Sequence, residues 1–402
     1  MGYGLLPHNV AHAFSRAVGR VDNGKILPEF IISSMLVPFY SLAAQHDQLR
    51  PEVLAAIADV YDKRQYVLGE QVQAFEAEYS AFNEVSYTIG VANGLDALKL
   101  SLRALGIGPG DEVLVPSNTF VATWLAVSHV GATPIPVEPD PATCNLDPTR
   151  LAVALTARTR AVLPVHLYGQ PCQMPPILAF AKQHELWVIE DNAQAQGATF
   201  EGQLTGSFGH ASATSFYPTK NLGALGDAGA VTTQNARMAR QLQRLRNYGS
   251  MQKNHHELPG YNSRLDELQA AVLRVKLRHL AAWTAQRRQL AAWYTECLAD
   301  VPGLQLPTVA TGAVPVWHLY VVHTAQRDAL QAYLATKGIG TLTHYPVPPH
   351  RQPAYAHLGL APGALPIAEE LAATCLSLPL WPGMTQEMVA GVGTAIRHFY
   401  VG

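Results

Sequence analysis

Apolar residues near the start of the regular part of the chain repeat at helical spacing. The clearest run consists of Leu49, Val53, Ile57 and Val60. Spacing of three to four residues places such side chains on one face of a helix. The turn Val67-Leu68-Gly69 interrupts the repeat, so the pattern predicts two helices within residues 48–81.

Residues 87 to 190 change to an alternation of short apolar runs and helical segments. The predicted strands are residues 87–91, 112–116, 133–137, 161–166 and 187–190. The predicted helices between them are residues 97–105, 119–130 and 175–185. Strands that alternate with helices favour a parallel sheet covered on both faces. The chain is therefore predicted to be an α/β protein, with ligands at the carboxyl ends of its strands.

The last third of the chain predicts a long helix and then a smaller α/β unit. The helix is predicted at residues 264–283, and a second periodic segment continues to Leu298. A linker rich in proline and glycine follows at residues 301–315. The expected elements of the smaller unit are strands at 317–323 and 340–344 and helices at 327–337, 367–376 and 385–399. We therefore predict a large domain at residues 35–265, and a long helix with a small domain at residues 266–402.

Residues 1–34 are predicted to be an N-terminal extension of the folded part. One interpretation takes Met35 as the natural start, because the pattern becomes regular after Val37. A secretory signal is the alternative, since basic residues precede an apolar segment at residues 26–44. Polar residues and a proline interrupt that segment, which disfavours the signal.

Charge and cysteine content exclude several classes of function. The 28 Lys and Arg residues nearly balance the 30 Asp and Glu residues. The chain therefore has no strong net charge that would favour binding to nucleic acid or to a membrane surface. No apolar run approaches the roughly 20 residues that cross a bilayer. The 4 cysteines lie far apart and form neither a disulfide framework nor a zinc-binding spacing. We expect a cytoplasmic protein without a metal site that acts on a small molecule.

Three residues near strand ends are candidates for binding. Asp191 follows an apolar strand and would project toward a cation in the crevice, or it is a helix N-cap. The Asn93-Gly94 turn joins a strand to a helix, which is either an anion site for a phosphate or an ordinary helix start. Phe120 is either a core residue or a platform for a cofactor ring.

Lys220 is the candidate for covalent chemistry. It lies in the segment Ser215–Ala230, an apolar and glycine-punctuated stretch with few carboxylates nearby. Burial in such surroundings lowers the pKa of an ammonium group and frees the amine to attack a carbonyl. A lysine on a surface loop is the alternative, because lysine is seldom fully buried.

Many spaced segments, in one order, resemble the DegT/DnrJ family of sugar aminotransferases. They are NGLDALKLSLRALGIGPGDEVLVPSNTFVATWLAV, LPVHLYGQP, VIEDNAQAQGA, SFYPTKNLGALGDAGA, LRNYGS, GYNSRLDELQAAVLRVKL, WHLYVV and THYPVPPH. The likeness runs from about Val37 to the C-terminus, and the NGLDAL, TWLAV and THYPVP variants are similar to sugar 3-aminotransferases. The resemblance implies the aspartate-aminotransferase fold (fold type I), with a mostly parallel mixed sheet in the large domain. It also implies pyridoxal 5'-phosphate as cofactor and a homodimer with shared active sites.

The resemblance also implies roles for single residues. Lys220 would bind the cofactor aldehyde and move a proton, and Asp191 would pair with the pyridine nitrogen. The other cofactor contacts would be Gln194 at the ring hydroxyl, Phe120 on the ring face, Gly94, Leu95 and Ser215 at the phosphate, and Asn262 from the partner subunit. His318 and Tyr345 would line the sugar and nucleotide region, or they are packed residues.

The implied reaction transfers the amino group of L-glutamate to a nucleotide-linked 3-keto-6-deoxyhexose, with dTDP as the expected nucleotide. The products are a dTDP-3-amino-3,6-dideoxyhexose and 2-oxoglutarate. The enzymatic alternatives are a 4-aminotransferase and a dehydratase of the same family, and Lys220 disfavours the dehydratases, which have histidine at that position. A non-catalytic regulator that keeps the fold is the alternative from another class.

The chain departs from the family pattern at several positions outside the implied cofactor contacts. Asn192 and Gln196 change the motif after the fifth predicted strand, and Ala228 replaces a common glycine. The loop around Lys253–His256 and the segment after Tyr345 also differ. These departures bear on the identity of the sugar rather than on transamination.

Overall fold

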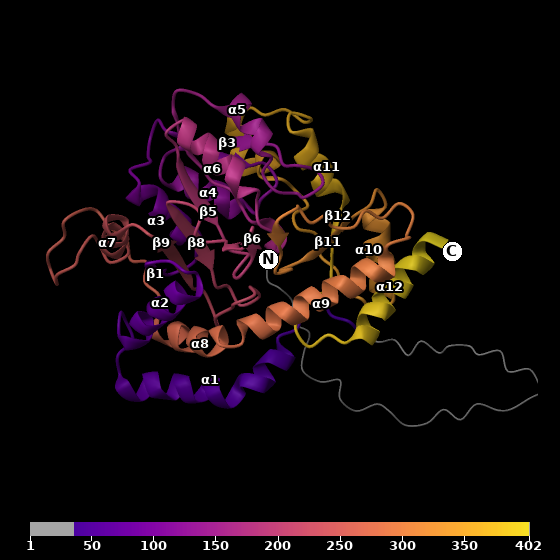
Figure 1. Ribbon diagram of the computed structural model, residues 1–402, viewed down its shortest axis with the longest axis horizontal. Coiled ribbons are helices and arrows are strands. Elements are labelled where there is room, and N and C mark those ends of the chain that lie inside the picture. Colours follow the sequence, from indigo (N-terminus) through magenta and orange to yellow (C-terminus); the bar gives the residue numbers. More distant parts are fainter. Residues whose placement is uncertain (1–35, 402) are drawn as a thin grey trace, which may run out of the picture. The chain divides into compact units, whose positions relative to one another are not determined.

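A computed structural model describes residues 36–401 (Figure 1). The predictions for residues 1–34 lie outside this range. Residues 36–401 lie in one compact unit. The proposed division of this unit at residue 265 stays a prediction.

A seven-stranded mixed sheet is the centre of this unit, in the spatial order β1-β9-β8-β5-β4-β2-β3. The strands are β1 Tyr87–Val91, β2 Glu112–Pro116, β3 Thr133–Val137, β4 Thr159–Val162, β5 Trp187–Asp191, β8 Ala211–Ser215 and β9 Gly229–Thr233. β9 is antiparallel to both β1 and β8, and the other pairs are parallel. The predicted α/β class, with a mixed and mostly parallel sheet, is confirmed.

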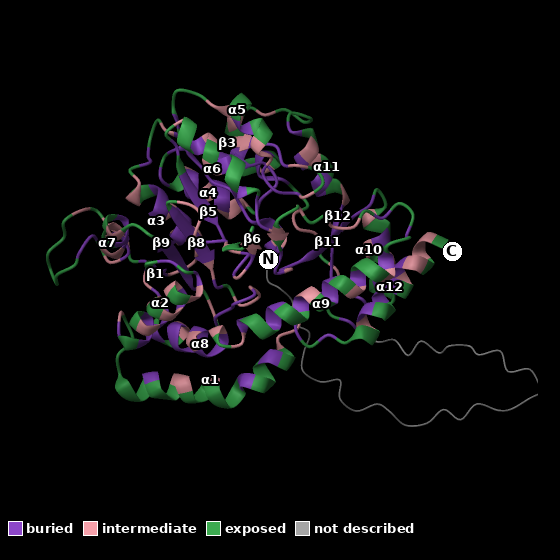
Figure 2. Cartoon of the chain, viewed as in Figure 1, coloured by how far each residue is buried: buried purple, intermediate pink, exposed green. Residues whose placement is uncertain are grey.

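Helices cover both faces of this sheet. Val113 and Val115 of β2 belong to a core built with α3 (Gly94–Ala104), α4 (Val121–His129) and α7 (Ala236–Leu245). Leu114 lies between them in the chain and belongs to a second core, with α5 (Leu151–Ala154) and α6 (Met174–Gln183). Successive side chains of a strand point to opposite faces, so a continuously apolar strand needs cover on both sides. Figure 2 shows the resulting buried centre.

Three helices pack together beside β1: α1 (Ala43–Lys63), α2 (Glu70–Phe82) and α8 (Glu267–Leu277). The buried Glu267 carboxylate joins two of them. It accepts hydrogen bonds from the amides of Gly69, Gln71 and Val72 at 2.6, 2.9 and 3.1 Å. These amides start α2 and have no partners within that helix, so Glu267 fixes the start of α8 against α2.

A two-stranded sheet of β11 (Tyr320–His323) and β12 (Cys375–Leu378) centres the C-terminal part. Its core includes α9 (Leu280–Leu298), α10 (Arg327–Thr336) and α12 (Gln386–Val401), and α11 (Pro366–Thr374) leads into β12. The first described residues join this core. Val37 forms a parallel bridge with Ile339, and the Pro38 carbonyl accepts a hydrogen bond from Trp381 Nε1 at 3.1 Å.

The remaining strands, β6 (Thr199–Phe200), β7 (Gln203–Leu204) and β10 (Ala313–Val314), form a small three-stranded sheet. It joins the segment after β5 to the segment before β11. Among residues 36–401, no helix is both long enough and apolar enough to cross a bilayer.

The C-terminal part differs from the prediction in two places. The helix expected at residues 264–283 is interrupted at Arg278 and His279, where α8 ends and α9 begins, and α9 continues through the second periodic segment to Leu298. Residues 340–344 are not a strand, because only Leu342 forms a bridge, to Ser377. The second strand is instead β12, which begins where a helix was expected to end. Four residues are too few to show a strand period, so the sequence pattern could not reveal it.

Candidate active site

Six strands of the large sheet have their carboxyl ends at one edge. β2, β3, β4, β5 and β8 are parallel, and β1 runs with them because β9 is antiparallel to both β1 and β8. Residues at or just beyond these ends are Gly94, Leu95, Phe120, Asp191, Gln194, Ser215 and Lys220. The fold therefore gathers seven of the ten residues that the sequence singled out, as expected for the crevice of such a sheet.

A tight turn after β8 presents Lys220. The Lys220 amide donates to the Tyr217 carbonyl at 2.8 Å, and the Ala224 amide donates to the Phe216 carbonyl at 2.8 Å. Only glycine fits at position 223, since a Cβ there would lie 2.3 Å from the Pro218 carbonyl oxygen. Burial lowers the pKa of Lys220 to about 8, and the charge of Asp191 opposes this shift. The amine is thus much easier to deprotonate than an exposed lysine, as the sequence suggested.

The Asp191 carboxylate is buried opposite Lys220. It accepts hydrogen bonds from Thr123 Oγ1 at 3.0 Å and from the Ala193 amide at 3.2 Å. Thr119 Oγ1 lies 2.9 Å from Thr123 Oγ1 and extends this hydroxyl chain. Burial raises the pKa of the Asp191 carboxyl, and the Ala193 and Thr123 hydrogen bonds and the Lys220 charge oppose the shift. The site can thus hold a further cationic group against Asp191.

An imidazole and a carboxylate lie behind Asp191 on neighbouring strand ends. His166 Nδ1 accepts a hydrogen bond from the Cys172 amide at 3.0 Å, so the hydrogen is on Nε2, which donates to Glu190 Oε2 at 2.9 Å. Glu190 also accepts from the amides of Gly206, Phe208 and Gly209. This fully buried network fixes the end of β5 and with it the position of Asp191.

Gln194, Tyr345 and Phe120 form one wall of the crevice. Gln194 Oε1 accepts from the Tyr168 amide at 2.6 Å, and Gln194 Nε2 donates to the Tyr345 hydroxyl at 3.1 Å. The Tyr345 and Phe120 ring centroids are 5.2 Å apart. Phe120 is 50% exposed. Its ring is therefore not a core side chain and remains available to stack on a planar ligand.

The start of α3 forms a small cradle against the end of β8. Asn93 caps the helix by accepting from the Asp96 amide at 2.8 Å, and the first intrahelical bond runs from the Ala97 amide to the Asn93 carbonyl. The amides of Gly94 and Leu95 precede that bond and can serve an anion. A Cβ at Gly94 would lie 2.6 Å from Ser215 Cβ, so glycine lets the helix start approach Ser215.

Asn221, which follows Lys220 in the chain, contacts His318 of the C-terminal part. The Asn221 amide nitrogen donates to the Val316 carbonyl at 3.1 Å, so its oxygen faces His318 Nδ1, 3.1 Å away. Burial, reinforced by the charges of Lys220 and Arg287, holds the pKa of His318 well below its usual range. The neutral ring donates through Nδ1, and Nε2 keeps a lone pair that can accept a hydrogen bond.

Asn262 is the exception among the predicted residues. It is exposed and forms a bridge with Asn247 in the segment after α7. Within residues 36–401, it takes part in none of the hydrogen bonds that join the other nine residues. The prediction that it acts on a partner subunit's site is not tested by a single chain.

Sequence reasoning missed the residues that support the site. Thr123 holds Asp191 and follows Phe120 by three residues, which places both on the first turn of α4. Asn221 holds His318, and Tyr168 holds Gln194. Tyr168 lies in the segment LPVHLYGQP that resembles the family, but only the folded chain shows that its amide contacts Gln194.

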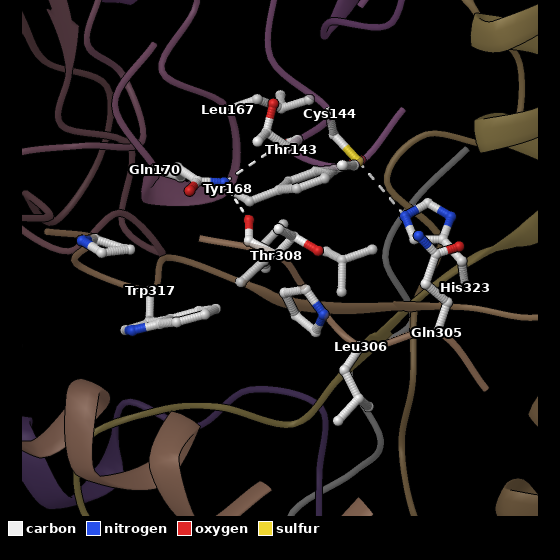
Figure 3. Close-up of a pocket in the computed structure, with 15 residues that line it drawn as sticks. Thr143, Cys144, Leu167, Tyr168, Gln170, Gln305, Leu306, Thr308, Trp317 and His323 are labelled. Atoms are coloured by element: carbon white, nitrogen blue, oxygen red, sulfur yellow. Dashed lines mark hydrogen bonds between the residues drawn. The ribbon is translucent and has the colours of Figure 1, made fainter. Parts of the chain in front are cut away.

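A separate cavity of about 30 Å³ lies beside Tyr168 (Figure 3). This volume holds roughly one water molecule, so a sugar cannot enter it. Cys144 Sγ lies 3.6 Å from His323 Nε2 at its wall, but burial raises the pKa of this thiol to about 12. The pair is therefore not a catalytic cysteine and histidine. In the part of the chain that the structure describes, no cluster of His, Cys, Asp and Glu could hold a metal ion.

Comparison with known proteins agrees with this geometry. A transaminase of Streptomyces venezuelae, named for dTDP-3-amino-3,4,6-trideoxy-α-D-glucose, is 51% identical over 363 residues, which are 90% of this chain and 96% of the relative. The erythromycin biosynthesis sensory transduction protein EryC1 of Saccharopolyspora erythraea is 52% identical over 353 residues, or 88% and 96% of the two chains.

A solved structure is equally similar. The crystal structure of S. venezuelae DesV in complex with a ketimine intermediate superimposes with a TM-score of 0.90 at 51% identity, and the match covers 91% of this chain and 99% of that one. Residues 47–397 match the family described as DegT/DnrJ/EryC1/StrS aminotransferases. This chain belongs to the DegT/DnrJ/EryC1/StrS aminotransferase family.

Proposed function

We propose that this enzyme transfers the amino group of L-glutamate to C3 of a dTDP-linked 3-keto-6-deoxyhexose. The products are the dTDP-linked 3-amino sugar and 2-oxoglutarate. The main support for this proposal is that Lys220, whose pKa is lowered to about 8, lies near the buried carboxylate of Asp191. The name of the S. venezuelae relative, a 3-amino-sugar transaminase, supports the nucleotide and the position of the amino group.

The residues of the crevice fit pyridoxal phosphate. Asp191 is a buried carboxylate that accepts hydrogen bonds from Thr123 and the Ala193 amide and suits a cationic partner, which the protonated pyridine nitrogen would provide. The α3 amides of Gly94 and Leu95, with the Ser215 hydroxyl, suit the phosphate. Gln194 would reach the ring hydroxyl, and Phe120 would stack on the ring face. When bound, the cofactor supplies an electron sink for the charge that develops at the substrate carbon.

The protein side chains supply the nucleophile and the proton transfers. Lys220 Nζ, once deprotonated, attacks an aldehyde and can later accept and return a proton at the substrate carbon. Thr123 and the Ala193 amide keep the Asp191 oxygens oriented. His318 Nε2 and the Tyr345 hydroxyl can orient hydroxyl groups of the sugar, and the apolar ring of Phe120 helps to exclude water.

The pH dependence of cofactor capture should report the lowered pKa of Lys220. Nucleophilic capture needs the neutral amine, and the pKa of about 8 lies below the ordinary 10.5. The rate constant for binding of pyridoxal phosphate to apoenzyme should therefore rise about tenfold per pH unit below pH 8 and level off above it. Stopped-flow absorbance between pH 6 and 10 measures this rate. A rate that keeps rising to pH 10 would contradict the assignment.

We also propose a homodimer whose partner subunit supplies Asn262. Apolar side chains are exposed where α2, α8 and the Lys220 turn meet, namely Tyr66, Val67, Leu225 and Leu268. Val67 pairs with Asp266, and the Leu225 amide donates to Gln269 Oε1, so these residues share one face. An exposed apolar face of this kind suits a second copy.

Asn262→Ala should weaken cofactor retention roughly tenfold, the effect of losing one hydrogen bond to a charged phosphate. Equilibrium dialysis of pyridoxal phosphate measures it, with Asn235→Ala as the control for an exposed asparagine. Sedimentation should show that both variants are dimers. An unchanged dissociation constant for Asn262→Ala would remove this residue from the site.

The substrate assignment can be tested with three acceptors. Purified enzyme and L-glutamate should convert dTDP-linked 3-keto-6-deoxy sugars, with or without the C4 hydroxyl, and mass spectrometry with NMR should place the amine at C3. A 4-keto sugar is the control. Preferred amination at C4 would favour the 4-aminotransferase alternative. The relative EryC1 is named a sensory transduction protein, which raises a signalling protein as the second candidate function. Absence of turnover with every acceptor would favour it.

We assign the enzyme to the cytoplasm. Its 4 cysteines are free thiols, which is the usual state in a reducing compartment. Fractionation of cells that express the tagged protein tests this assignment, and recovery in the membrane or secreted fraction would contradict it.

A further inference from the structure

Lys276 is a buried ammonium group that the reaction does not use. Lys276 lies on α8, and the whole residue is 4% exposed. Nζ donates to the Gly223 carbonyl at 2.7 Å. Among residues 36–401, no carboxylate lies within ion-pair distance of it, and an ammonium has three hydrogens to donate. A buried cation without an anion is costly, and such groups are normally paired.

A cavity of about 160 Å³ opens beside Lys276, between α1 and the turn that carries Lys220. Its polar lining consists of Lys276, Gln45, His46 and Arg50. Its apolar lining consists of Leu49, Val53, Leu54, Ile57 and Leu225. The cavity lining thus combines cationic and aliphatic side chains. Figure 2 shows that the outer side of α1 is exposed.

The nearby acidic residues do not neutralise this cation. Glu52 pairs with Arg278 at 2.7 Å. Burial and the charge of Lys276 lower the pKa of His46. The charge of the neighbouring Asp47 opposes this lowering, so Asp47 interacts with His46. Burial alone lowers the pKa of Lys276 to about 8, so the group is still largely protonated at neutral pH.

We propose that the cavity beside Lys276 binds a small organic carboxylate. The carboxylate accepts hydrogen bonds from Lys276 Nζ, with Gln45, His46 and Arg50 around it, and its aliphatic body contacts Leu49, Val53 and Ile57. The five aliphatic side chains favour this class over an inorganic anion, because a bare phosphate would leave them in contact with water.

The site is close to the catalytic lysine through the chain. Lys276 holds the carbonyl of Gly223, which closes the turn that begins at Pro218 and contains Lys220. A carboxylate bound to the remaining ammonium hydrogens would therefore lie one side chain away from this turn. The binding site itself is independent of the sugar substrate and of the proposed reaction.

Calorimetric titration of the pyridoxal-phosphate-loaded enzyme with sodium butyrate tests the proposal. Butyrate should bind saturably at one site per chain, and 1-butanol and inorganic phosphate should bind at least about tenfold more weakly at that site. At pH 8.5, binding should take up protons from the buffer, because a carboxylate beside Lys276 raises the pKa of this lysine. Two buffers with different ionisation enthalpies reveal this uptake.

Two variants separate this site from the active site. Lys276→Met removes the cation, and Leu54→Trp fills the cavity from the half-exposed side of α1. Each should weaken butyrate binding at least about tenfold, whereas the exposed Lys337→Met should leave it unchanged. If Lys276→Met does not fold, Leu54→Trp decides. The proposal would be overturned if the folded variants bound butyrate with unchanged affinity. It would also be overturned if titration of the parent enzyme gave no saturable heat of binding.

Discussion

Lys220→Met is expected to lower the rate of transamination by roughly 10⁴-fold or more, because the nucleophile and the proton carrier are lost together. Methionine has a similar length and suits the apolar turn, so the fold should remain. The measurement is formation of 2-oxoglutarate from L-glutamate with the 3-keto sugar present. Borohydride reduction of the parent enzyme, followed by peptide mass spectrometry, should place the cofactor on Lys220.

Lys182→Met is the matched control, since Lys182 is exposed on α6. It should keep parental activity and the covalent adduct. A Lys220→Met enzyme that retains more than a few per cent of the parental rate, or an adduct on another lysine, would show that Lys220 is not the nucleophile.

Asp191→Asn is expected to keep bound cofactor but to lose about 10²- to 10³-fold in turnover, as when one charge-stabilising group is removed from an active site. Asparagine has the same size and can keep the hydrogen bond from Thr123. It cannot neutralise a protonated pyridine nitrogen, so the cofactor ring becomes a poorer electron acceptor. Steady-state rates and the cofactor content of the same samples separate binding from catalysis.

Thr123→Val provides a graded comparison for Asp191. It removes one of two hydrogen bonds to the carboxylate but keeps its charge, and we expect a loss of about tenfold. Equal losses in the two variants would indicate that the orientation of Asp191 matters more than its charge. Near-parental turnover of Asp191→Asn would remove the carboxylate from the mechanism.

The chemistry at strand ends was predictable from the sequence because the polar residues there interrupt otherwise apolar runs. Lys220 and Asp191 stood out in this way, and the family, the cofactor and the aminotransferase activity implied by the resemblance are confirmed by the comparisons. Their supporting residues did not stand out. Thr123 and Asn221 are ordinary polar residues until the fold brings them to Asp191 and His318, over 68 and 97 positions of the chain.

Five of the seven strands of the large sheet were predicted, because each is a distinct apolar run between turns. The other two, β8 and β9, have the sequences ASATS and GAVTT, which are short and rich in small polar residues and show no apolar run. The C-terminal part was predicted less well, since its strands are short and are held by contacts distant in sequence. Residues 340–344 had the composition of a strand, yet Leu342 alone meets Ser377. Nothing local marks the interruption at Arg278 and His279, where neither glycine nor proline occurs. Contacts across the fold decide such elements more than local preference does.

The bridge between Val37 and Ile339 has a consequence for attempts to divide the molecule. Because residues from both ends of the described chain share one core, cleavage within the exposed segment at residues 309–313 should produce two fragments that remain associated under native conditions. A gene fragment that encodes only the C-terminal portion would lack Val37 and the Pro38 carbonyl that Trp381 contacts. Co-expression with the N-terminal fragment should restore both, so complementation would succeed where expression of the isolated portion fails.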